Sequence, residues 1–246
     1  MIGWFKFGDI DTRNYDHIVV CEGEVDSASI RLFDEVVIAG KNGTLLIDTG
    51  RYDNVLHSYD IIVHEEYVDS LIQLRNDLQS QTGYKTLIDG FNVGESYIAR
   101  LDSSFIPKQT RNRNAGTLHI EFSRFPQRYL ASGKVEIALT HRDDPYVITN
   151  PTPFDAKPLI VVTGSGTFTI EDKTLTVLQG ASTFQTIYID CETMEAWERV
   201  DGGIVPRNDY IQNIDDGFPV LKSGANNVTV GSGIMFLKIT PRWWRV

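Results

Sequence analysis

The sequence predicts a mainly β protein of two domains, with the sandwich or barrel architecture that short strands usually build. Three observations support this prediction. Short alternating runs recur along nearly the whole chain, only one segment has a helical period, and a proline-rich segment near residue 150 separates two β-rich halves. At 246 residues the chain is long enough for two cores.

The clearest strand signal lies at residues 117–123. Leu118, Ile120 and Phe122 alternate there with His119 and Glu121, which is the period of a half-buried strand. Other short runs bounded by Gly, Asn, Asp or Pro are predicted as strands at residues 29–33, 35–39, 56–63, 97–101, 159–162, 167–170, 174–178, 185–190 and 234–239.

One helix is predicted at residues 65–79. Tyr67, Leu71, Leu74 and Leu78 recur at steps of four, three and four, so they share one helical face. Acidic residues at its start suit the positive end of the helix dipole, and Gly83 provides a stop signal soon after its end.

Three prolines within residues 149–158 predict a stiff connector between the domains, because proline fixes φ and removes a backbone donor. We therefore expect a first domain over residues 1–148 and a second, all-β domain over residues 149–246. Glycines at 164, 166, 202 and 203 mark turns of the second domain, and residues 191–194 resemble a hairpin loop.

Composition excludes several classes of protein. The net charge of −10 argues against binding to nucleic acid through phosphate neutralisation. The longest apolar runs are far shorter than a membrane span, so no membrane insertion is expected. The first residues have no leader pattern, which predicts no secretion signal. Cys21 and Cys191 lie far apart and outside any CxxC pair, so neither a disulfide framework nor a zinc site is predicted.

Charge is distributed unevenly along the chain. Residues 1–66 hold 5 basic and 13 acidic side chains, whereas residues 100–142 hold 8 basic and 3 acidic ones. Two differently solvated surfaces would explain this pattern, and so would complementary faces that meet between subunits, which would favour head-to-tail assembly. Arg111 and Arg113, in a basic loop, are candidates for a subunit or partner contact.

No catalytic, cofactor or metal motif is found. The sequence contains no GxxxxGK[ST], GxSxG or HExxH, and the run at residues 164–169 lacks the third glycine of a dinucleotide fingerprint. The five histidines are scattered without ligand spacing. We expect no enzyme activity and no cofactor.

Two alternatives remain open. Carboxylate pairs at 65–66, 143–144 and 215–216 are the kind of residues that a glycosidase needs, although adjacent carboxylates seldom act together. Phe184, Tyr188 and Trp197 are candidates for a saccharide-binding face, which would suit a carbohydrate-binding module or host-surface adhesin. Core packing is the ordinary interpretation of such aromatic residues.

The chain closes on an adjacent tryptophan pair, Trp243 and Trp244, flanked by Arg242 and Arg245. Termini stay loose unless they are held, and such a pair forms a large amphipathic anchor. Both tryptophans are therefore candidate contact residues, docking on their own chain or on a neighbour. Return of this tail onto the first domain is one way of covering a sheet edge.

Taken in order, several short motifs resemble the distal tail (Dit-type) protein of long-tailed phages, the siphoviruses and prophages of Gram-positive bacteria. Each motif is weak alone, but their order spans nearly the whole chain around the single helix. They are FKFGD at 5–9, KNG at 41–43, DTGRY at 48–52, TGYKTL at 82–87, YIARL at 97–101, FSRFPQRY at 122–129, NPTP at 150–153 and PRWW at 241–244.

The resemblance implies a structural hub without catalysis. It implies a first domain that is a β-sandwich with a helix and forms a hexameric ring, and a second domain that is a galectin-like β-sandwich. The implied partners are further copies of the chain, the major tail tube protein, the tape-measure protein, the tail-associated fibre or lysin protein and, as a further candidate, a receptor-binding protein. DNA would pass through the lumen, in a virion tail tip made in the cytoplasm of the host bacterium.

Overall fold

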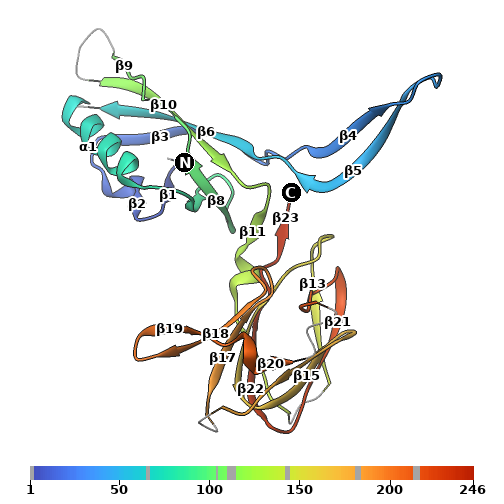
Figure 1. Cartoon of the computed structure of the whole chain (residues 1–246). Helices are drawn as coiled ribbons and strands as arrows, with labels where there is room; N and C mark the ends of the chain where they lie inside the picture. Colours follow the sequence, from blue (N-terminus) through green and yellow to red (C-terminus); the bar gives the residue numbers. More distant parts are fainter. Residues whose placement is uncertain are drawn as a thin grey trace. The chain divides into compact units, whose positions relative to one another are not determined.

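The computed structural model describes residues 3–64, 67–103, 105–109, 115–141, 145–180, 184–212 and 217–246. The chain forms two compact units, Met1–Arg128 together with Val246, and Tyr129–Arg245 (Figure 1). The prediction of a mainly β protein is confirmed, and the described residues contain one α-helix. No helix in these ranges is long and apolar enough to cross a membrane.

The first unit contains one antiparallel sheet with the strand order β2-β1-β7-β8-β10-β6-β3. Side chains from β1, β3, β6, β7, β8 and β10 share one core, and a short strand, β9 (Lys108–Gln109), pairs with β10. The strands of the main path are β1 (Phe5–Phe7), β2 (Ile10–Asp11), β3 (Ile18–Gly23), β6 (Val55–His64), β7 (Lys85–Asp89), β8 (Glu95–Leu101) and β10 (Ala115–Arg124). A 3-10 turn, η1 (Thr12–Asn14), follows β2.

The alternation in β10 builds this core as predicted. Leu118, Ile120 and Phe122 are buried while His119 is exposed, and β6 opposes β10 residue by residue. The helix α1 (Tyr67–Ser80) packs Leu74 and Leu78 into the same core. The predicted helix start at residues 65 and 66 lies outside the described residues.

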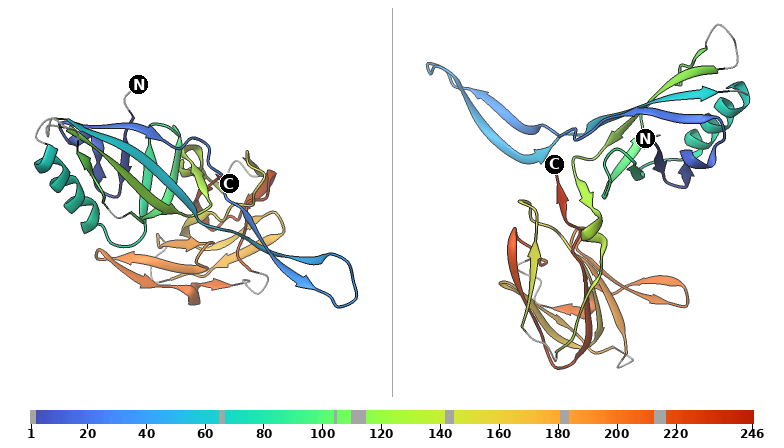
Figure 2. Two further views of the ribbon diagram at one scale, coloured as in Figure 1. Left: turned by 90° about the horizontal axis from the view of Figure 1, so that it is seen from above. Right: turned by 180° about the vertical axis from the view of Figure 1, so that it is seen from behind.

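A long hairpin, β4 (Arg31–Val37) and β5 (Thr44–Tyr52), is inserted between β3 and β6 and extends away from the rest of the first unit (Figures 1 and 2). Among the described residues these two strands form a sheet of their own. The prediction of separate strands at 29–33 and 35–39 was wrong, because both runs belong to one continuous strand, β4.

The second unit is a sandwich of two antiparallel sheets. One sheet has the order β12-β22-β14-β17-β18-β19, and the other has the order β13-β21-β15-β16-β20. Their strands are β12 (Ile137–Leu139), β13 (Tyr146–Asn150), β14 (Leu159–Gly164), β15 (Gly166–Ile170), β16 (Lys173–Val177), β17 (Thr186–Asp190), β18 (Glu195–Val200), β19 (Gly203–Pro206), β20 (Ile211–Gln212), β21 (Gly224–Val230) and β22 (Ile234–Thr240). Short 3-10 turns are η2 (Ala131–Lys134) and η4 (Asn208–Tyr210).

The division between the units lies at residues 128 and 129, earlier than the boundary at 148 and 149 that the prolines predict. Two strands that precede the prolines belong to the second sandwich, because β12 pairs with β22 and β13 pairs with β21. The proline-rich segment is a connection inside that sandwich. Asn150 holds it by donating to the carbonyl oxygens of Phe154 and Leu221.

The tryptophan pair belongs to the second unit. Trp243 is buried in its core, and Trp244 stacks on Phe154 with ring centroids 4.4 Å apart. Trp244 also donates to the carbonyl oxygen of Asp155, and β23 (Trp244–Arg245) pairs with β11 (Arg128–Leu130). The apolar contacts of both tryptophan side chains lie within the sandwich, whereas Val246 is grouped with the first unit. Return of the extreme C-terminus onto the first domain therefore stays a prediction.

An ion pair holds the residue that precedes the tryptophan pair. Arg242, with φ of 61°, donates to both carboxylate oxygens of Asp190 at 2.7 and 2.8 Å. Burial alone would raise the pKa of Asp190, but the hydrogen bonds from Arg242 and from the Glu192 N–H hold it below its usual value. The tail is thus anchored by charge as well as by burial.

Gly133 is expected to be essential for the docking of the tail. A Cβ at this position would lie 2.2 Å from the backbone nitrogen of Trp243, and the Gly133 carbonyl oxygen accepts the Arg242 N–H. Gly133→Ala should lower the free energy of unfolding by about 1–3 kcal/mol or more in urea titrations. Gly203→Ala is the matched control, because a Cβ there meets only the Val200 carbonyl oxygen, at 3.4 Å. Equal stability of the two variants would contradict this account.

Candidate functional site

The most exposed apolar surface of the first unit lies on the hairpin, which we call the arm (residues 30–53). Leu32 on the arm is partly buried, but eight other large apolar side chains of the arm are between 40% and 79% exposed. They are Ile30, Phe33, Val36, Val37, Ile38, Leu45, Leu46 and Ile47.

Both faces of the arm are apolar. Val36 pairs with Leu45, so these side chains share one face, whereas the neighbouring pairs Val37–Thr44 and Glu35–Leu46 point to the other. A strand of an ordinary half-buried sheet would carry apolar residues on only one face. The arm therefore has no face that is suited to water alone.

The arm has features that are typical of a contact surface. An isolated two-stranded hairpin is marginally stable in water, and clustered exposed apolar side chains mark protein–protein contact sites. One surface ion pair, between Arg31 and Asp48, helps to hold the two strands together. A pair this exposed contributes at most about 1 kcal/mol. These features make the arm a candidate contact site.

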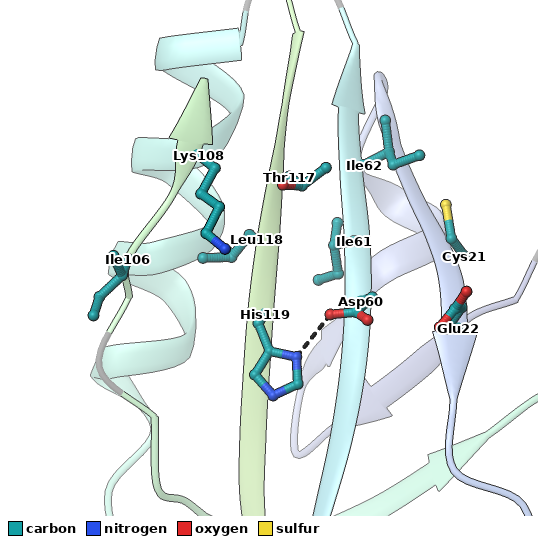
Figure 3. A pocket seen from close by; sticks show the side chains of 10 residues that line it. All are labelled: Cys21, Glu22, Asp60, Ile61, Ile62, Ile106, Lys108, Thr117, Leu118 and His119. Atoms are coloured by element: carbon teal, nitrogen blue, oxygen red, sulfur yellow. Dashed lines mark hydrogen bonds and ion pairs between the residues drawn. The ribbon is translucent and has the colours of Figure 1, made fainter. Parts of the chain in front are cut away.

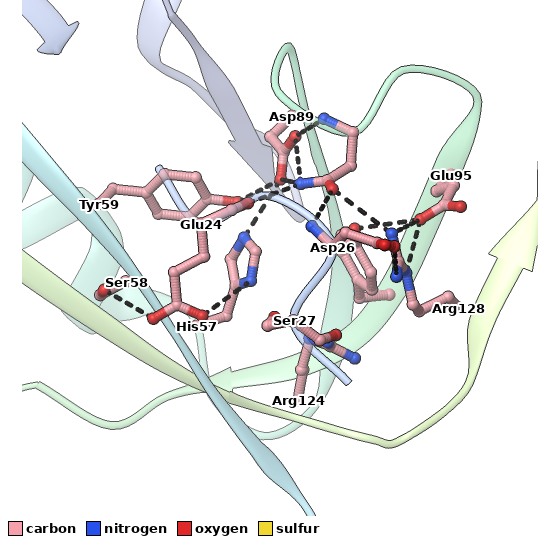
Figure 4. A network of polar contacts seen from close by, with 12 residues as sticks. Glu24, Asp26, Ser27, His57, Ser58, Tyr59, Asp89, Glu95, Arg124 and Arg128 are labelled. Atoms are coloured by element: carbon pink, nitrogen blue, oxygen red, sulfur yellow. Dashed lines mark hydrogen bonds and ion pairs between the residues drawn. The ribbon is translucent and has the colours of Figure 1, made fainter. Parts of the chain in front are cut away.

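A buried polar network lies where the arm joins the sheet (Figure 4). At its centre is Asp89, at the end of β7, which accepts hydrogen bonds from the Tyr59 hydroxyl at 2.7 Å and from the backbone N–H groups of Phe91 and Asn92 at 2.8 and 2.6 Å. His57 Nε2 lies 3.3 Å from the same carboxylate. Burial alone would raise the pKa of Asp89, but these hydrogen bonds lower it.

Two arginines complete this network. Arg128 is paired with Glu95 and with Asp26, and Arg124 donates to the carbonyl oxygen and hydroxyl of Ser27. Both side chains are almost completely buried. The network thus connects the sheet with the segment that leads into the arm.

A shallow hollow of about 310 Å³ lies on the outer face of β3, β6 and β10 (Figure 3). Its rim carries Cys21, Lys108 and an ion pair between His119 and Asp60, in which Nδ1 and Oδ1 are 2.7 Å apart. The described residues contain no group of three His, Cys, Asp or Glu side chains that could hold a metal. The hollow contains no nucleophile–base pair, and both cysteines are free.

His119 should titrate above its ordinary pKa. The hydrogen bond and charge of Asp60 raise the pKa of His119, and Glu121 adds to this effect. The pair therefore stabilises the folded state below the unfolded pKa of about 6.5, and this small contribution disappears as the pH rises through the higher folded value. NMR titration should give a midpoint above 6.5 that falls in Asp60→Asn. An unchanged midpoint in that variant would contradict the pairing.

The aromatic residues proposed for a saccharide face lie on the second unit. Tyr188 and Trp197 are cross-strand partners with parallel rings 5.8 Å apart, and the Arg199 guanidinium lies over the Tyr188 ring. Phe184 is well exposed. Tyr188 and Trp197 are both partly buried and contact each other, so a saccharide face at this place stays a prediction.

The structure describes two of the four predicted contact residues, Trp243 and Trp244. Arg111 and Arg113 lie outside the described residues, as do the three carboxylate pairs at 65–66, 143–144 and 215–216. Trp243 and Trp244 are used within the second unit. The uneven charge is partly explained inside one chain, since Arg128 of the basic segment pairs with Asp26 of the acidic one.

Sequence reasoning missed the arm. The useful signal is a run of β-branched and leucine residues on both sides of Lys41-Asn42-Gly43 that does not alternate with polar residues. Without alternation, no face is predicted to be buried, and the strand β5 is easily taken for a loop.

Comparisons with known proteins identify the fold. No protein-family model matches the sequence, and neither does any curated protein. Among solved structures, the Dit protein of phage SPP1, described as a paradigm of the hub adsorption apparatus in phages that infect Gram-positive bacteria, matches with a TM-score of 0.69 and 13% identity. This match covers 97% of the present chain and 98% of the SPP1 chain.

Chains from two structures of the phage P2 baseplate in its activated conformation also match. The structure with Ca gives a TM-score of 0.55 at 10% identity and covers 97% of this chain and 98% of that chain. The structure with Sr gives 0.54 at 10% identity, covering 100% and 99%. At these identities the matches show a shared fold over nearly the full length of each chain.

Proposed function

We propose that this chain is a Dit-type distal tail protein, the structural hub of a phage tail tip. The observation that supports this most strongly is the fold shared with the SPP1 hub protein over 97% of this chain and 98% of that one. The match includes both units, so the proposal concerns the whole described chain. A virion tail tip is the location that this function implies.

The assembly that we propose is a homohexameric ring formed by the first unit. The arm supports self-assembly, because apolar side chains on both of its faces are exposed and its two strands form a sheet of their own among the described residues. A heterologous contact, in which the arm of one copy meets a different surface on the next, closes into a ring when the rotation permits.

The proposed partners follow from this position in the tail. The ring would join the major tail tube protein and the tape-measure protein to the tail-associated fibre or lysin protein and to a receptor-binding protein, and DNA would pass through the lumen. An acidic chain with a net charge of −10 suits a conduit that should not retain DNA. We propose no catalytic role for the chain.

The test is the solution mass of the purified protein by light scattering over a concentration series, with negative-stain imaging of the largest species. We expect a species of six times 27.7 kDa with a central opening. A monomer at every concentration would contradict self-assembly into a ring. A closed ring of another copy number would contradict the hexamer while supporting the hub.

A further inference from the structure

The segment that leads into the arm, residues 24–29, has no strand partner but is densely hydrogen bonded. Asp26 adopts a φ of 57°, and its N–H donates to Asn92 Oδ1 at 3.1 Å. Asn92 Nδ2 in turn donates to the Glu24 carbonyl oxygen at 2.9 Å, and the Ser58 hydroxyl donates to the Glu24 carboxylate. Side chains therefore hold this segment in place of a backbone ladder.

Two buried arginines supply the charged part of this attachment. Arg128 is 2% exposed and binds Glu95 at 2.7 Å as well as the Asp26 carboxylate. Arg124 is 1% exposed, and one of its terminal nitrogens donates both to the carbonyl oxygen and to the hydroxyl of Ser27. Its guanidinium carbon lies 4.8 Å from the centre of the Tyr97 ring.

The chain that leaves the arm is attached next to the same arginine. Asn54 Nδ2 donates to the hydroxyl of Ser123, the residue before Arg124, at 3.3 Å. The two strands of the arm are also joined where they meet the sheet. The Asp53 N–H donates to the carbonyl oxygen of Ile30, and the Ser29 hydroxyl donates to the carbonyl oxygen of Asp53. We call the two segments where the arm joins the sheet, residues 26–29 and 53–54, the arm root. The end of β10 therefore contacts both segments of the arm root.

Electrostatics make this attachment stiff. A buried guanidinium is costly unless its donors are satisfied, and burial lowers the pKa of Arg124. If residues 26 and 27 moved away, Arg124 would lose both Ser27 acceptors and Arg128 would lose the Asp26 carboxylate. Displacement of the arm root therefore has a higher free-energy cost than displacement of an ordinary surface loop.

We infer that Arg124 and Arg128 are positioning residues for assembly, which hold the arm root in the orientation that a neighbouring copy recognises. This inference rests on the proposed function, since it assigns a purpose to the arm. The arginines touch no neighbour in this role. They restrict the arm before it docks, so that less conformational entropy is lost on assembly.

Asp26→Asn tests the inference, because it removes the charge that pairs with Arg128, while asparagine tolerates a positive φ. We expect hydrogen exchange of the amides of residues 26, 53 and 54 to rise at least about tenfold, with the thermal midpoint unchanged within about 2 °C. We also expect the concentration at half-assembly to rise about tenfold. Asp201→Asn is the matched control, since Asp201 also has a positive φ and lies in the exposed turn after β18.

Each outcome decides the question. Wild-type exchange at the root in Asp26→Asn would overturn the inference, as would faster exchange with unchanged assembly. Arg128→Lys, which keeps the charge but loses the two-pronged geometry, should show the same local change as Asp26→Asn. Failure of the hub proposal would look different, since the wild-type chain would then not assemble at all.

Discussion

Replacing Val37 and Leu46 by serine should abolish most self-assembly while leaving the fold intact. These side chains lie on one face of the arm and are 79% and 56% exposed, so the isolated chain loses little by the change. If a neighbouring copy covers these side chains, replacing each one removes about 1.5 kcal/mol or more of association free energy from the subunit contact. The concentration at half-assembly should therefore rise at least about 100-fold.

Sedimentation or mass photometry over a concentration series would measure this shift, with urea unfolding of the same samples to confirm that stability is retained. Val147→Ser is the matched control, because Val147 is 61% exposed on β13 of the second unit and should leave assembly unchanged. Wild-type assembly of the double variant would exclude that face of the arm as a subunit contact.

Asp89→Asn should cause the largest loss of stability among single substitutions in the first unit that we consider. The buried side chain accepts hydrogen bonds from Tyr59, from His57 and from the N–H groups of Phe91 and Asn92, and the side-chain amide of Asn92 adds longer contacts of 3.3 and 3.4 Å. An amide would place donors against donors. We expect the free energy of unfolding to fall by about 3–5 kcal/mol.

The pH dependence should change with it. The folded pKa of Asp89 is below its unfolded value of about 3.9, so its contribution is present above pH 4 and is lost as the pH falls through the folded value. Asp89→Asn should remove this part of the acid destabilisation. Asp102→Asn is the control, since its pair with Arg100 is partly exposed and contributes at most about 1 kcal/mol. A loss below about 1 kcal/mol for Asp89→Asn would refute a stabilising network.

Some of the fold could be predicted from sequence because local patterns were consistent with the tertiary structure. The alternation around Ile120 and the helical period that ends at Leu78 both reappear as buried faces. The domain boundary could not be predicted from the prolines, because β12 and β13 are short and their partners, β22 and β21, lie far along the chain: Leu139 pairs with Leu237 and Asn150 pairs with Gly224. Pairings over such separations leave no local signal.

The candidate site was predicted less well than the fold. The resemblance to distal tail proteins correctly anticipated the shared fold, but its proposed contacts at Arg111 and Arg113 remain predictions. The arm was missed because its residues satisfy no burial pattern within one chain. Clustered apolar side chains that stay exposed have no alternating period from which sequence analysis could detect them.

By itself, the sequence determined the β-rich class, the single helix and the acidic character of the chain, since these follow from composition and short-range periodicity. Only the tertiary structure decided that Arg124 and Arg128 meet Ser27 and Asp26 about a hundred residues away, and that the tryptophan tail is anchored through Arg242 and Asp190. Contacts between such distant residues depend on how strands pair and pack, and that arrangement is a property of the whole fold.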